Sequence, residues 1–516
     1  MKIDAQPFLL SRHGASAGWT PPRFALALAL LLLAIFVLTT PRHIGDALEY
    51  ASMTAALANH ASPDIRLADI AAARAQMPPQ YGPGFDALAD GMRANAQVPL
   101  SGFYRGADGH VYAIHFFAYS ALAAVPFTLL QAAGMPAFKC FQAVNLAFVF
   151  VLGMALLRLF GCAARAAVGV LAFLLCGGLL YLQWSSPECM SAAALLAGLV
   201  LYSTGAPLAG GLLGGIGALQ NPPLVLFCAF APLLRLCVCY RAQQSFGANL
   251  REALPARAVA GLVLAASLSA LPVLFSLYQF DTPNLIVKFA TEQRLITWKR
   301  LHSFFFDLNQ GALLGVPAVA AALCVWPAAK GARWRTLALT VTAAAFTVAL
   351  AVPSLATQNW NSGSAGIMRY AVWASMPLLF AFLWRLRLAP RWPLALLAAV
   401  VTVQTLAMAS AHRYGELQFS PLATRVLQHA PGWYHPDPEI FWERAQGHES
   451  FPEPQKIFSW PADGPAVKTL YHQSNLAVDA QLCGPGRRLA RENRVAEADY
   501  GWRYIDGIVR CEDAPH

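Results

Sequence analysis

The chain has 516 residues, of which 57% are hydrophobic and only 12% are charged, and its formal net charge is +10. The charged fraction is about half that of a soluble domain, and the apolar residues form long uninterrupted blocks, which together exclude a series of soluble domains. No clustered basic face accompanies the net charge, so nucleic-acid binding is excluded as well. Residues 1–411 hold 26 Lys+Arg and 13 Asp+Glu, whereas residues 412–516 hold 11 and 14. The positive excess therefore lies in the apolar part, where it is typical of cytoplasmic loops.

Apolar segments that could cross a bilayer follow one another from residue 24 to residue 411. A helix needs about 20 apolar residues to cross the hydrocarbon core. Nine segments approach or reach that length: Phe24–Thr40, Phe138–Arg158, Ala166–Leu182, Cys189–Thr204, Ala258–Phe280, Gly311–Ala328, Thr336–Pro353, Tyr370–Trp384 and Pro393–Ala411. Two shorter runs, Ala206–Leu219 and Pro223–Cys239, flank Asn221-Pro222-Pro223 and are interpreted as short helices packed within the protein. The sequence thus predicts an all-α polytopic membrane protein with about eleven transmembrane helices.

Basic residues orient these helices through the positive-inside rule. They gather in four connections between apolar segments, Arg158–Arg165, Arg235–Arg257, Lys330–Arg335 and Arg385–Arg391. All four connections are cytoplasmic if residues 1–23 are cytoplasmic and the C-terminus lies outside. This arrangement requires that Val111–Gln131 lies at the outer interface or re-enters the bilayer, which is tolerated for a segment buried in protein. We expect a multi-pass protein of a bacterial inner membrane, with its first apolar segment retained because no convincing small-residue cleavage site follows it.

Two polar stretches then face outward from the membrane domain of residues 24–411. The first is the extracytoplasmic loop of residues 43–110. The second is residues 412–516, whose short alternating runs among Pro and Gly predict a small mixed α/β domain. Eight of the ten cysteines lie in apolar segments, and only Cys483 and Cys511 lie in the C-terminal part. In an oxidising compartment these two thiols are expected to form a disulfide.

Acidic residues are scarce between residues 112 and 411. Only five occur there, Glu188, Glu252, Asp281, Glu292 and Asp307. On the predicted topology all but Glu252 lie at outward helix ends. Ionisable groups close to a bilayer are unfavourable and are functional candidates by default. Polar chemistry is therefore expected at the outer leaflet.

The first outward loop opens with a helical run, Ala47–Ala58, that has two acids at its start. Asp46 and Glu49 are three residues apart and share a helix face, and Tyr50 follows one turn after Asp46. Asp46 is equally well interpreted as the N-cap of the helix and as a carboxylate held outside the membrane as a general base. A capping residue is also rigidly mounted, so the two roles are compatible.

Further candidates lie at the end of this loop and in the segments that follow it. His110, Tyr112 and His115 lead into the interfacial segment, although a lone histidine is more often a packed or surface residue than a catalytic one. Glu188 opens a helix in the next outward connection, where an acid also complements the helix dipole.

Basic and amide side chains in the remaining outward loops suit a phosphate. Lys299 and Arg300 give one loop positive charge against the positive-inside trend, either as an interfacial Trp/Lys/Arg belt or as ligands of a lipid phosphate. Asn359 lies in a Gly- and Ser-containing loop that ends at Arg369-Tyr370. Arginine favours bidentate contact with phosphate, although an ordinary loop with a snorkelling arginine explains the same pattern.

Motifs of soluble nucleotide- and metal-dependent enzymes are absent. The chain has no GxGxxG after a strand, no GxxxxGK[ST], no HExxH and no paired CxxC. We therefore expect no cofactor and no divalent metal.

The ordered set of outward residues resembles the GT-C superfamily of polytopic glycosyltransferases, which use lipid-linked sugar donors. The likeness covers roughly residues 20–411 and is strongest toward bacterial members, among relatives such as protein O-mannosyltransferases, oligosaccharyltransferases and aminoarabinose transferases. It rests on Gly45-Asp46 with Tyr50, Gly109–His115, Pro187-Glu188, Asn221-Pro222-Pro223 and the loop before Arg369-Tyr370.

One position departs from the family pattern. The first outward loop of the family commonly carries Asp-Glu-x-x-Tyr, and here Asp46 and Tyr50 fit while Ala47 stands where the second acid would be. Glu49, about one helical turn along, partly substitutes for it. Glu188 stands where the family often has an acid in its next outward loop.

The resemblance implies a reaction as well as a fold. The donor would be a sugar on a polyprenyl phosphate, and the acceptor an unidentified glycan, lipid or protein on the outer side. Asp46 would take the proton of the attacking hydroxyl, and one direct displacement would invert the anomeric centre. Phosphate-binding candidates are Arg369 first, then His115, Lys299 and Arg300. Catalytic candidates besides Asp46 are Glu49 and Glu188, and substrate-positioning candidates are Tyr50, His110, Tyr112, Asn359 and Tyr370.

Two other classes of function stay open. A lipid or solute transporter would also be polytopic, but it often shows an inverted repeat and binding groups at mid-membrane, and neither is evident here. A GT-C-like scaffold without activity is compatible with the missing second acid at Ala47.

Overall fold

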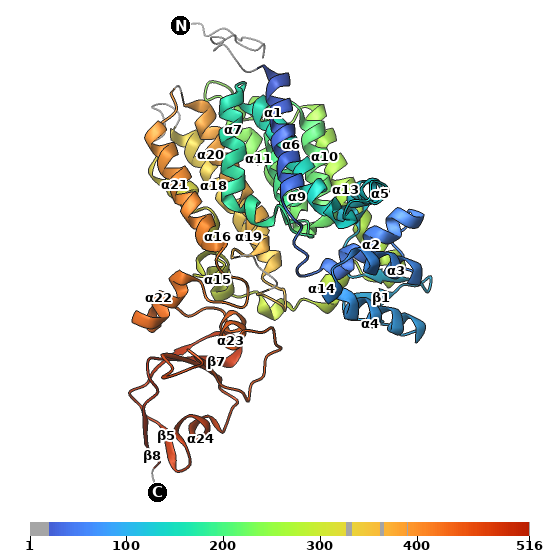
Figure 1. Ribbon diagram of the computed structural model, residues 1–516. Helices are drawn as coiled ribbons and strands as arrows, with labels where there is room; N and C mark the ends of the chain where they lie inside the picture. The colour runs from blue at the N-terminus through green and yellow to red at the C-terminus, as the bar shows by residue number, and fades with distance from the viewer. Residues whose placement is uncertain (1–19, 327–332, 362–365, 390, 515–516) are drawn as a thin grey trace.

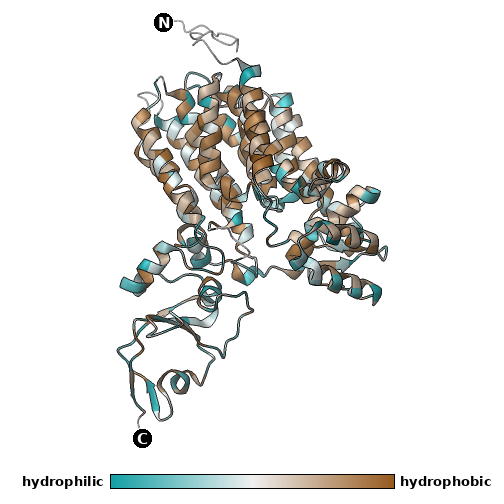
Figure 2. Cartoon of the chain, in the orientation of Figure 1, coloured by the Kyte–Doolittle hydropathy of each residue, from teal (hydrophilic) through white to brown (hydrophobic). Residues whose placement is uncertain are grey.

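In a computed structural model the chain forms a helical bundle with two smaller bodies attached at one end, which we call the polar end (Figure 1). The structure describes residues 20–326, 333–361, 366–389 and 391–514. Of the features that the sequence analysis uses, residues 1–19, Lys330 and residues 362–365 lie outside these ranges. Figure 2 shows the apolar residues concentrated in the bundle and the hydrophilic ones in the two smaller bodies.

Eight helical segments of the described chain are long and apolar enough to cross a bilayer, which makes the chain a helical membrane protein. They are α1 (Pro21–Leu38); η2 (Ala137–Lys139) with α6 (Cys140–Phe160); α7 (Ala163–Phe173) with η3 (Leu174–Gly178) and α8 (Leu179–Tyr181); η4 (Pro222–Leu226) with α11 (Phe227–Cys239); α13 (Ala256–Phe280); α18 (Arg333–Ser354); α19 (Arg369–Ala374) with α20 (Met376–Leu388); and α21 (Leu394–Ala411).

Three other predicted spans fall short of that length. The helix α9 (Glu188–Ser203) has 16 residues and α10 (Pro207–Gln220) has 14. The segment after Gly311 divides into α16 (Ala312–Gly315) and α17 (Pro317–Val325), because a proline cannot continue the hydrogen bonding of the helix before it. Length and composition therefore support eight of the eleven predicted spans.

The short helices are accommodated because they lie inside the bundle. Nearly every residue of α9 is buried, and α10 packs against α9 and α13. A Cβ atom on Gly211 would lie 2.0 Å from the carbonyl oxygen of Gly261, so α10 and α13 approach closely only because both positions are glycine. The first helix, α1, packs on α6 by placing Leu28 against Gly153.

The segment at Val111–Gln131 forms a strand and a short helix. The strand β2 (Val111–Ala113) pairs with β1 (Phe103–Arg105), and the helix α5 (Ala118–Ala132) has 15 residues. At 1.5 Å per residue this helix is about 22 Å long, less than the roughly 30 Å of a hydrocarbon core. Its length agrees with a segment that does not span as a straight helix.

The first polar stretch is a folded helical body, whereas the sequence analysis anticipated a helix only at its start. It contains α2 (Ala47–His60), α3 (Leu67–Gln76), η1 (Pro79–Tyr81) and α4 (Gly82–Arg93). Ala51, Ile70, Phe85 and Leu88 are buried in a core that continues into α5 and α6. The helices α3 and α4 contain few large apolar residues among their alanines and glycines, so the periodic apolar pattern that predicts a helix is weak there.

The C-terminal body has the predicted mixture of helices and strands. Its helical elements are α22 (Pro421–His429), η6 (Pro431–Trp433), α23 (Pro438–Gln446), α24 (Val478–Cys483) and η7 (Asp499–Gly501). Its strands are β3 (Phe458–Trp460), β4 (Lys468–His472), β5 (Arg487–Leu489), β6 (Arg494–Glu497), β7 (Trp502–Asp506) and β8 (Cys511–Asp513). An antiparallel sheet in the order β3-β4-β7-β6 forms its centre, and β5 pairs with β8. Cys483 and Cys511 are bonded to each other, as predicted.

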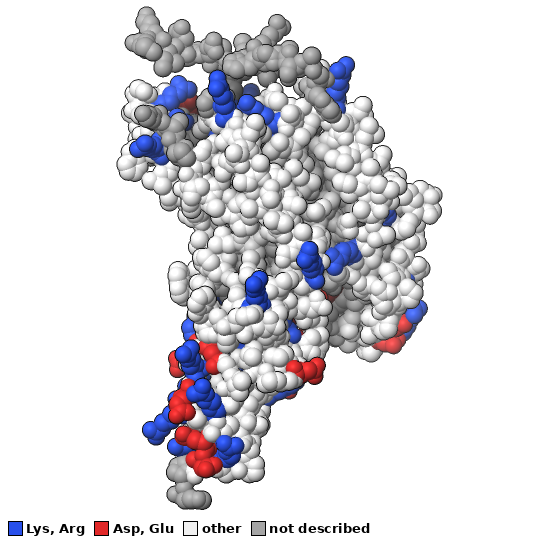
Figure 3. Space-filling view, turned by 60° about the vertical axis from the view of Figure 1, so that its left-hand side comes forward, with Lys and Arg blue, Asp and Glu red and all other residues white. Residues whose placement is uncertain are grey.

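Charge is distributed unevenly between the two ends of the molecule. Figure 3 shows mainly Lys and Arg at the end of the bundle where α1 begins, and both signs of charge on the C-terminal body. Four helical elements on either side of α13 complete the chain between α11 and α16. The helix α12 (Phe246–Ala253) precedes α13, and α14 (Leu285–Phe289), η5 (Gln293–Leu295) and α15 (Trp298–Phe306) follow it. The polar end thus brings α2, α9, α15 and α19 to the boundary of the apolar bundle (Figure 1).

Candidate functional site

Asp46 stands at the N-cap position of α2, but its side chain makes no capping hydrogen bond. Its Oδ2 instead accepts a hydrogen bond of 2.7 Å from Nη1 of Arg369 and lies 3.4 Å from Nε2 of His115. Gly45 before it has φ of +63°, a conformation that glycine adopts without strain. The carboxylate at the helix start is therefore held by side chains from two other segments and not by the backbone of its own helix.

Arg369 connects this carboxylate with a second one. It begins α19, is buried, and its Nε lies 4.0 Å from Oε1 of Glu188 at the start of α9. Its Nη2 also donates to the hydroxyl of Tyr370 at 3.3 Å. The two carboxylates thus lie on either side of one guanidinium at the polar end of the bundle.

Tyr50 fixes the position of His115. The two rings stack with their centroids 5.1 Å apart, and the buried Tyr50 hydroxyl accepts a hydrogen bond of 3.2 Å from Nε2 of Gln220. The Oε1 of Gln220 accepts in turn from the backbone N–H of Tyr119. Gln220 is the last residue of α10 and directly precedes Asn221-Pro222-Pro223. The motif therefore ends α10 at the residue whose side chain supports Tyr50.

Glu49 lies one turn into α2, against the backbone of the β1 segment. A Cβ atom on Gly102 would lie 2.6 Å from Oε1 of Glu49, so the absence of a side chain at Gly102 makes room for this carboxyl group. We call Asp46, Glu49, His115, Glu188 and Arg369 the Asp46 cluster. All five are residues that the sequence analysis proposed, and they come from four separate parts of the chain.

The surroundings of the two acids at the start of α2 shift their pKa values in opposite directions. Burial opposes ionisation of Asp46, but the charges of Arg369 and His115 outweigh it and hold the pKa of this carboxyl well below its ordinary value. Burial and the charge of Asp46 raise the pKa of Glu49 to about 7. Burial acts to lower the pKa of His115, but the charge of Asp46 outweighs it and raises this pKa above its ordinary value. A carboxyl group that is ionised at neutral pH in the resting site thus lies beside one whose pKa is near neutral, and such a separation of pKa values is typical of acid–base sites.

Lys299 and Arg300 are engaged with the C-terminal body. The Nζ of Lys299 donates to the carbonyl oxygen of Glu497 at 2.9 Å. Arg300 is 2% exposed and lies 3.2 Å from Asp437 and 3.5 Å from Glu439. The structure thus places both side chains at an interdomain contact, which is a structural role that the sequence analysis did not anticipate.

Three further candidates lie apart from the Asp46 cluster. His110 and Tyr112 surround Asp108, whose carboxylate accepts a hydrogen bond of 2.6 Å from the Tyr112 hydroxyl and lies 3.3 Å from Nδ1 of His110. Gln279 at the end of α13 donates to the same carboxylate at 3.0 Å. Asn359 is exposed in the loop before α19.

A cavity that the sequence analysis missed opens between the segments that lead to the Asp46 cluster. Its volume is 190 Å³, and it is lined by Arg42, Leu180, Trp184, Ala411, His412, Arg413, Tyr414, Gly415, Glu416 and Gln418. We call it the Arg42 cavity. Arg42 lies four residues before Asp46, and Trp184 lies four residues before Glu188. No local pattern marks these residues, because the segments after α1 and α21 meet only in the folded chain.

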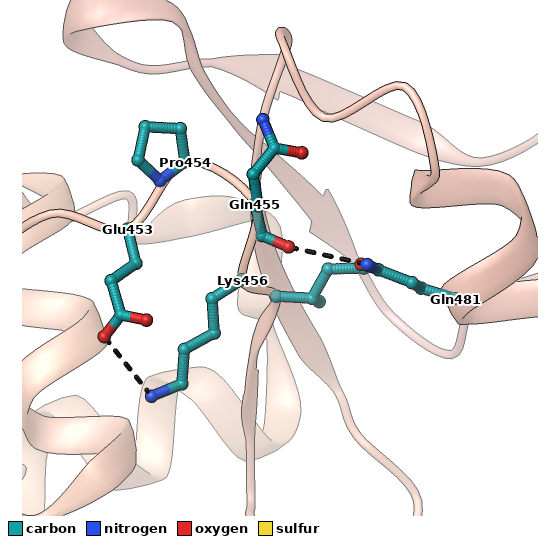
Figure 4. Close-up of a pocket in the computed structure, with 6 residues that line it drawn as sticks. Glu453, Pro454, Gln455, Lys456 and Gln481 are labelled. Atoms are coloured by element: carbon teal, nitrogen blue, oxygen red, sulfur yellow. Dashed lines mark hydrogen bonds and ion pairs between the residues drawn. The ribbon is translucent and has the colours of Figure 1, made fainter.

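Two other cavities are lined by other segments of the chain. One of 340 Å³ lies between β1 and the end of α13 and includes Tyr104, Arg105 and Phe289. One of 630 Å³ lies in the C-terminal body (Figure 4). Its polar side chains have partners within the same body: Glu453 pairs with Lys456 at 3.8 Å, and the Gln481 side chain donates to the backbone carbonyl of Gln455 at 3.5 Å.

Among the residues that the structure describes, no three His, Cys, Asp or Glu side chains are grouped so that they could hold a metal ion.

No protein-family model, no curated protein and no solved structure matches the chain.

Proposed function

We propose that the protein is a membrane glycosyltransferase that moves a sugar from a polyprenyl-phosphate-linked donor to an acceptor outside the cytoplasm. One observation carries the proposal. Asp46 leaves the start of α2 without a side-chain cap and is instead held by His115 and Arg369 where the apolar bundle ends. A residue at an N-cap position whose side chain contacts other polar residues, and does not cap its helix, is typical of a functional site. The resemblance of the ordered outward residues to the GT-C superfamily supports the same reaction.

In the proposed reaction the acceptor oxygen forms a bond to the anomeric carbon of the donor. The bond from that carbon to the lipid phosphate oxygen breaks, and its electron pair leaves with the phosphate. Asp46 accepts the proton of the attacking hydroxyl, and Glu49, whose pKa is raised to about 7, serves as the nearby group that exchanges protons with solvent. Arg369 supplies positive charge where negative charge develops on the leaving phosphate. One displacement inverts the anomeric centre.

The proposed orientation places the N-terminus in the cytoplasm and the polar end outside the inner membrane of a bacterium. The Lys- and Arg-rich end of the bundle supports this orientation through the positive-inside rule (Figure 3). The disulfide between Cys483 and Cys511 supports an oxidising environment for the C-terminal body. A lipid-linked donor would then present its phosphate at the height of the Asp46 cluster.

The test is sugar transfer by purified protein from labelled polyprenyl-phosphate sugars to a membrane extract. Asp46→Asn should lower the transfer rate by roughly 10²-fold or more, because general-base catalysis contributes about 10²–10⁴-fold. Asp86→Asn is the matched control, since Asp86 is an exposed acid of the same body that pairs with Arg74 at 2.8 Å. Thermal melting of each variant separates loss of chemistry from loss of fold.

Equal transfer by Asp46→Asn and wild type would overturn the role of Asp46. Failure of the wild type with every labelled donor would instead favour the two other classes, a transporter or an inactive scaffold.

A further inference from the structure

The helix α13 presents a stripe of exposed side chains that leads to the polar end of the bundle. Val263, Leu271, Leu274 and Tyr278 recur at helical spacing on one face, and each is at least half exposed. The 21 positions from Arg257 to Tyr278 cover about 32 Å, close to the roughly 30 Å of a hydrocarbon core. Tyr278 therefore lies at the boundary between hydrocarbon and headgroups, where tyrosine is enriched.

The short helix α14 follows α13 and lies beside the first polar body (Figure 1). The side chain of Asn284 caps it by accepting a hydrogen bond of 2.8 Å from a backbone N–H of its first turn. Leu285 is buried, whereas Val287 and Phe289 are 56% and 45% exposed. The helix thus turns one apolar side chain inward and presents two others outward.

The exposed residues of α13 and α14 form one surface with the first polar body. Tyr278, Lys288 and Phe289 line the same cavity of 340 Å³ as Val98 and Tyr104. The rings of Tyr104 and Phe289 stack with their centroids 4.5 Å apart. The name α14 surface is used below for Val98, Tyr104, Tyr278, Val287, Lys288 and Phe289. Through Tyr278 it continues the exposed stripe of α13.

Lys288 adds a positive charge to this apolar surface. Its side chain is exposed, and its Nζ lies 5.4 Å from the centroid of the Phe289 ring. In the described part of the chain no carboxylate oxygen lies within 4.0 Å of this Nζ. Aromatic and aliphatic side chains that surround a lysine are typical of segments at a bilayer interface, where the ammonium group meets lipid phosphates.

We infer that the α14 surface docks on the lipid leaflet at the polar end of the bundle. Lys288 lies at the level of the lipid phosphates, and Val287 and Phe289 lie at the boundary of the acyl chains. Continuity with the exposed stripe of α13 selects lipid as the occupant over a protein partner, because a bilayer around α13 already reaches Tyr278. The inference depends on the chain being a membrane protein and not on the proposed reaction.

Docking at α14 bears on one edge of the Asp46 cluster. Tyr104 of β1 stacks on Phe289, and Gly102, two residues earlier in the chain, makes room for the carboxyl group of Glu49. Contact between α14 and lipid therefore fixes the height of this edge above the membrane.

Photocrosslinking of the full-length protein in vesicles tests the docking. A benzophenone amino acid replaces Val287 or Phe289, one position per variant, in vesicles of equal parts phosphatidylcholine and phosphatidylglycerol. Both positions should form adducts with lipid at a yield comparable to position 274, because Leu274 lies on the exposed stripe of α13. Leu476, which is 96% exposed on the C-terminal body, is the negative control. Using two positions preserves the test if one variant fails to fold, which thermal melting detects.

Lys288→Gln tests the charge of the surface. With the photoreactive group at position 289, the substitution should lower the ratio of phosphatidylglycerol to phosphatidylcholine adducts by up to roughly fivefold, since a lysine near lipid phosphates attracts anionic headgroups by about that factor. Lys456→Gln is the matched control, because Lys456 is an exposed lysine of the C-terminal body. It should leave the ratio unchanged.

Lipid adducts at position 274 without any at positions 287 and 289 would overturn the docking. Adducts at these two positions with a second copy of the chain in place of lipid would overturn lipid as the occupant. An equal lipid yield at position 476 would overturn the specificity of the α14 surface, and an unchanged adduct ratio in Lys288→Gln would overturn the role of its charge. None of these readouts uses sugar transfer, so they are independent of the test of the proposed function.

Discussion

At the scale of single residues, the arrangement of Asp46 and Glu49 is the most informative feature. Both lie on one face at the start of α2, yet Arg369 keeps the first ionised while burial favours the proton on the second. Asp46 has an oppositely charged neighbour within 2.7 Å, whereas Glu49 faces the backbone at Gly102. Two carboxyl groups on one helix face therefore differ in pKa because their surroundings differ.

The raised pKa of Glu49 predicts how stability depends on pH. The folded protein keeps the proton on Glu49 up to a pKa of about 7, whereas the unfolded chain loses it near the ordinary value of 4.5. Between these values the folded state binds more protons, so its stability falls as pH rises through this window. Glu49→Gln mimics the protonated form and should lose less stability between pH 4.5 and pH 7 than wild type, as measured by thermal melting.

Glu453→Gln is the control for removing one carboxyl group, because Glu453 is exposed on the C-terminal body. Its melting curve should keep the pH slope of the wild type. A wild-type slope in Glu49→Gln would show that Glu49 does not titrate between these two values.

At the scale of elements, α23 connects the C-terminal body to the membrane bundle. Glu439 of α23 accepts from the backbone N–H of Asn361 at 2.8 Å, and Glu443 accepts from the Asn361 side chain at 2.8 Å. Arg444 donates to Oδ1 of Asn361 at 3.0 Å. Asn361 lies eight residues before Arg369, so the C-terminal body supports one end of the segment that leads to the Asp46 cluster. This body is thereby a structural part of the candidate site's surroundings.

Arg300 of α15 should be essential to this connection. Burial raises the pKa of Asp437 and Glu439, and Arg300 opposes this shift by lying between the two carboxylates. Removing one partner of a buried ion pair costs about 3–5 kcal/mol, because the remaining charges are left uncompensated. Arg300→Gln should therefore unfold at lower denaturant concentration and be cut faster by protease between Ala411 and Ser420.

The neighbouring Lys299→Gln is the control, since Lys299 is exposed and its side chain makes a single hydrogen bond among the described residues, to the carbonyl of Glu497. It should unfold and resist protease as the wild type does. Wild-type behaviour of Arg300→Gln would mean that other contacts hold the C-terminal body in place.

At the scale of the whole molecule, both polar bodies lie at the same end of the bundle (Figure 1). The opposite end carries the basic connections, including Arg241, which pairs with Glu252 at 2.9 Å. A membrane protein with this distribution has one side for its polar bodies and another for its basic loops. Single cysteines placed on each side therefore test the orientation of the chain as a whole.

Asp86→Cys in the first body and Glu453→Cys in the C-terminal body should react with a membrane-impermeant maleimide in intact cells. Arg241→Cys should react only after the membrane is permeabilised. The wild type gives the background, because its eight free cysteines include the exposed Cys324. Labelling of Arg241→Cys in intact cells together with protection of the other two would reverse the proposed orientation.

The sequence by itself determined the features that depend on local composition. Uninterrupted apolar runs predicted eight helices that the structure contains, and the position of Cys483 and Cys511 outside those runs predicted their disulfide. The spacing of Asp46 and Glu49 also placed them together at the start of α2. Such features follow from the transfer of each segment into lipid and from helical periodicity, which act within a few turns of chain.

Only the tertiary structure decided which distant residues meet. Arg369 reaches Asp46 across 323 positions of sequence, Arg300 turns to the C-terminal body, and Arg42 joins Arg413 around one cavity. These contacts depend on which helices pack side by side, and close approaches such as that of Gly211 to Gly261 set that packing. Hydropathy assigns an apolar helix to the membrane but does not select its neighbours, because lipid and protein interiors are similarly apolar.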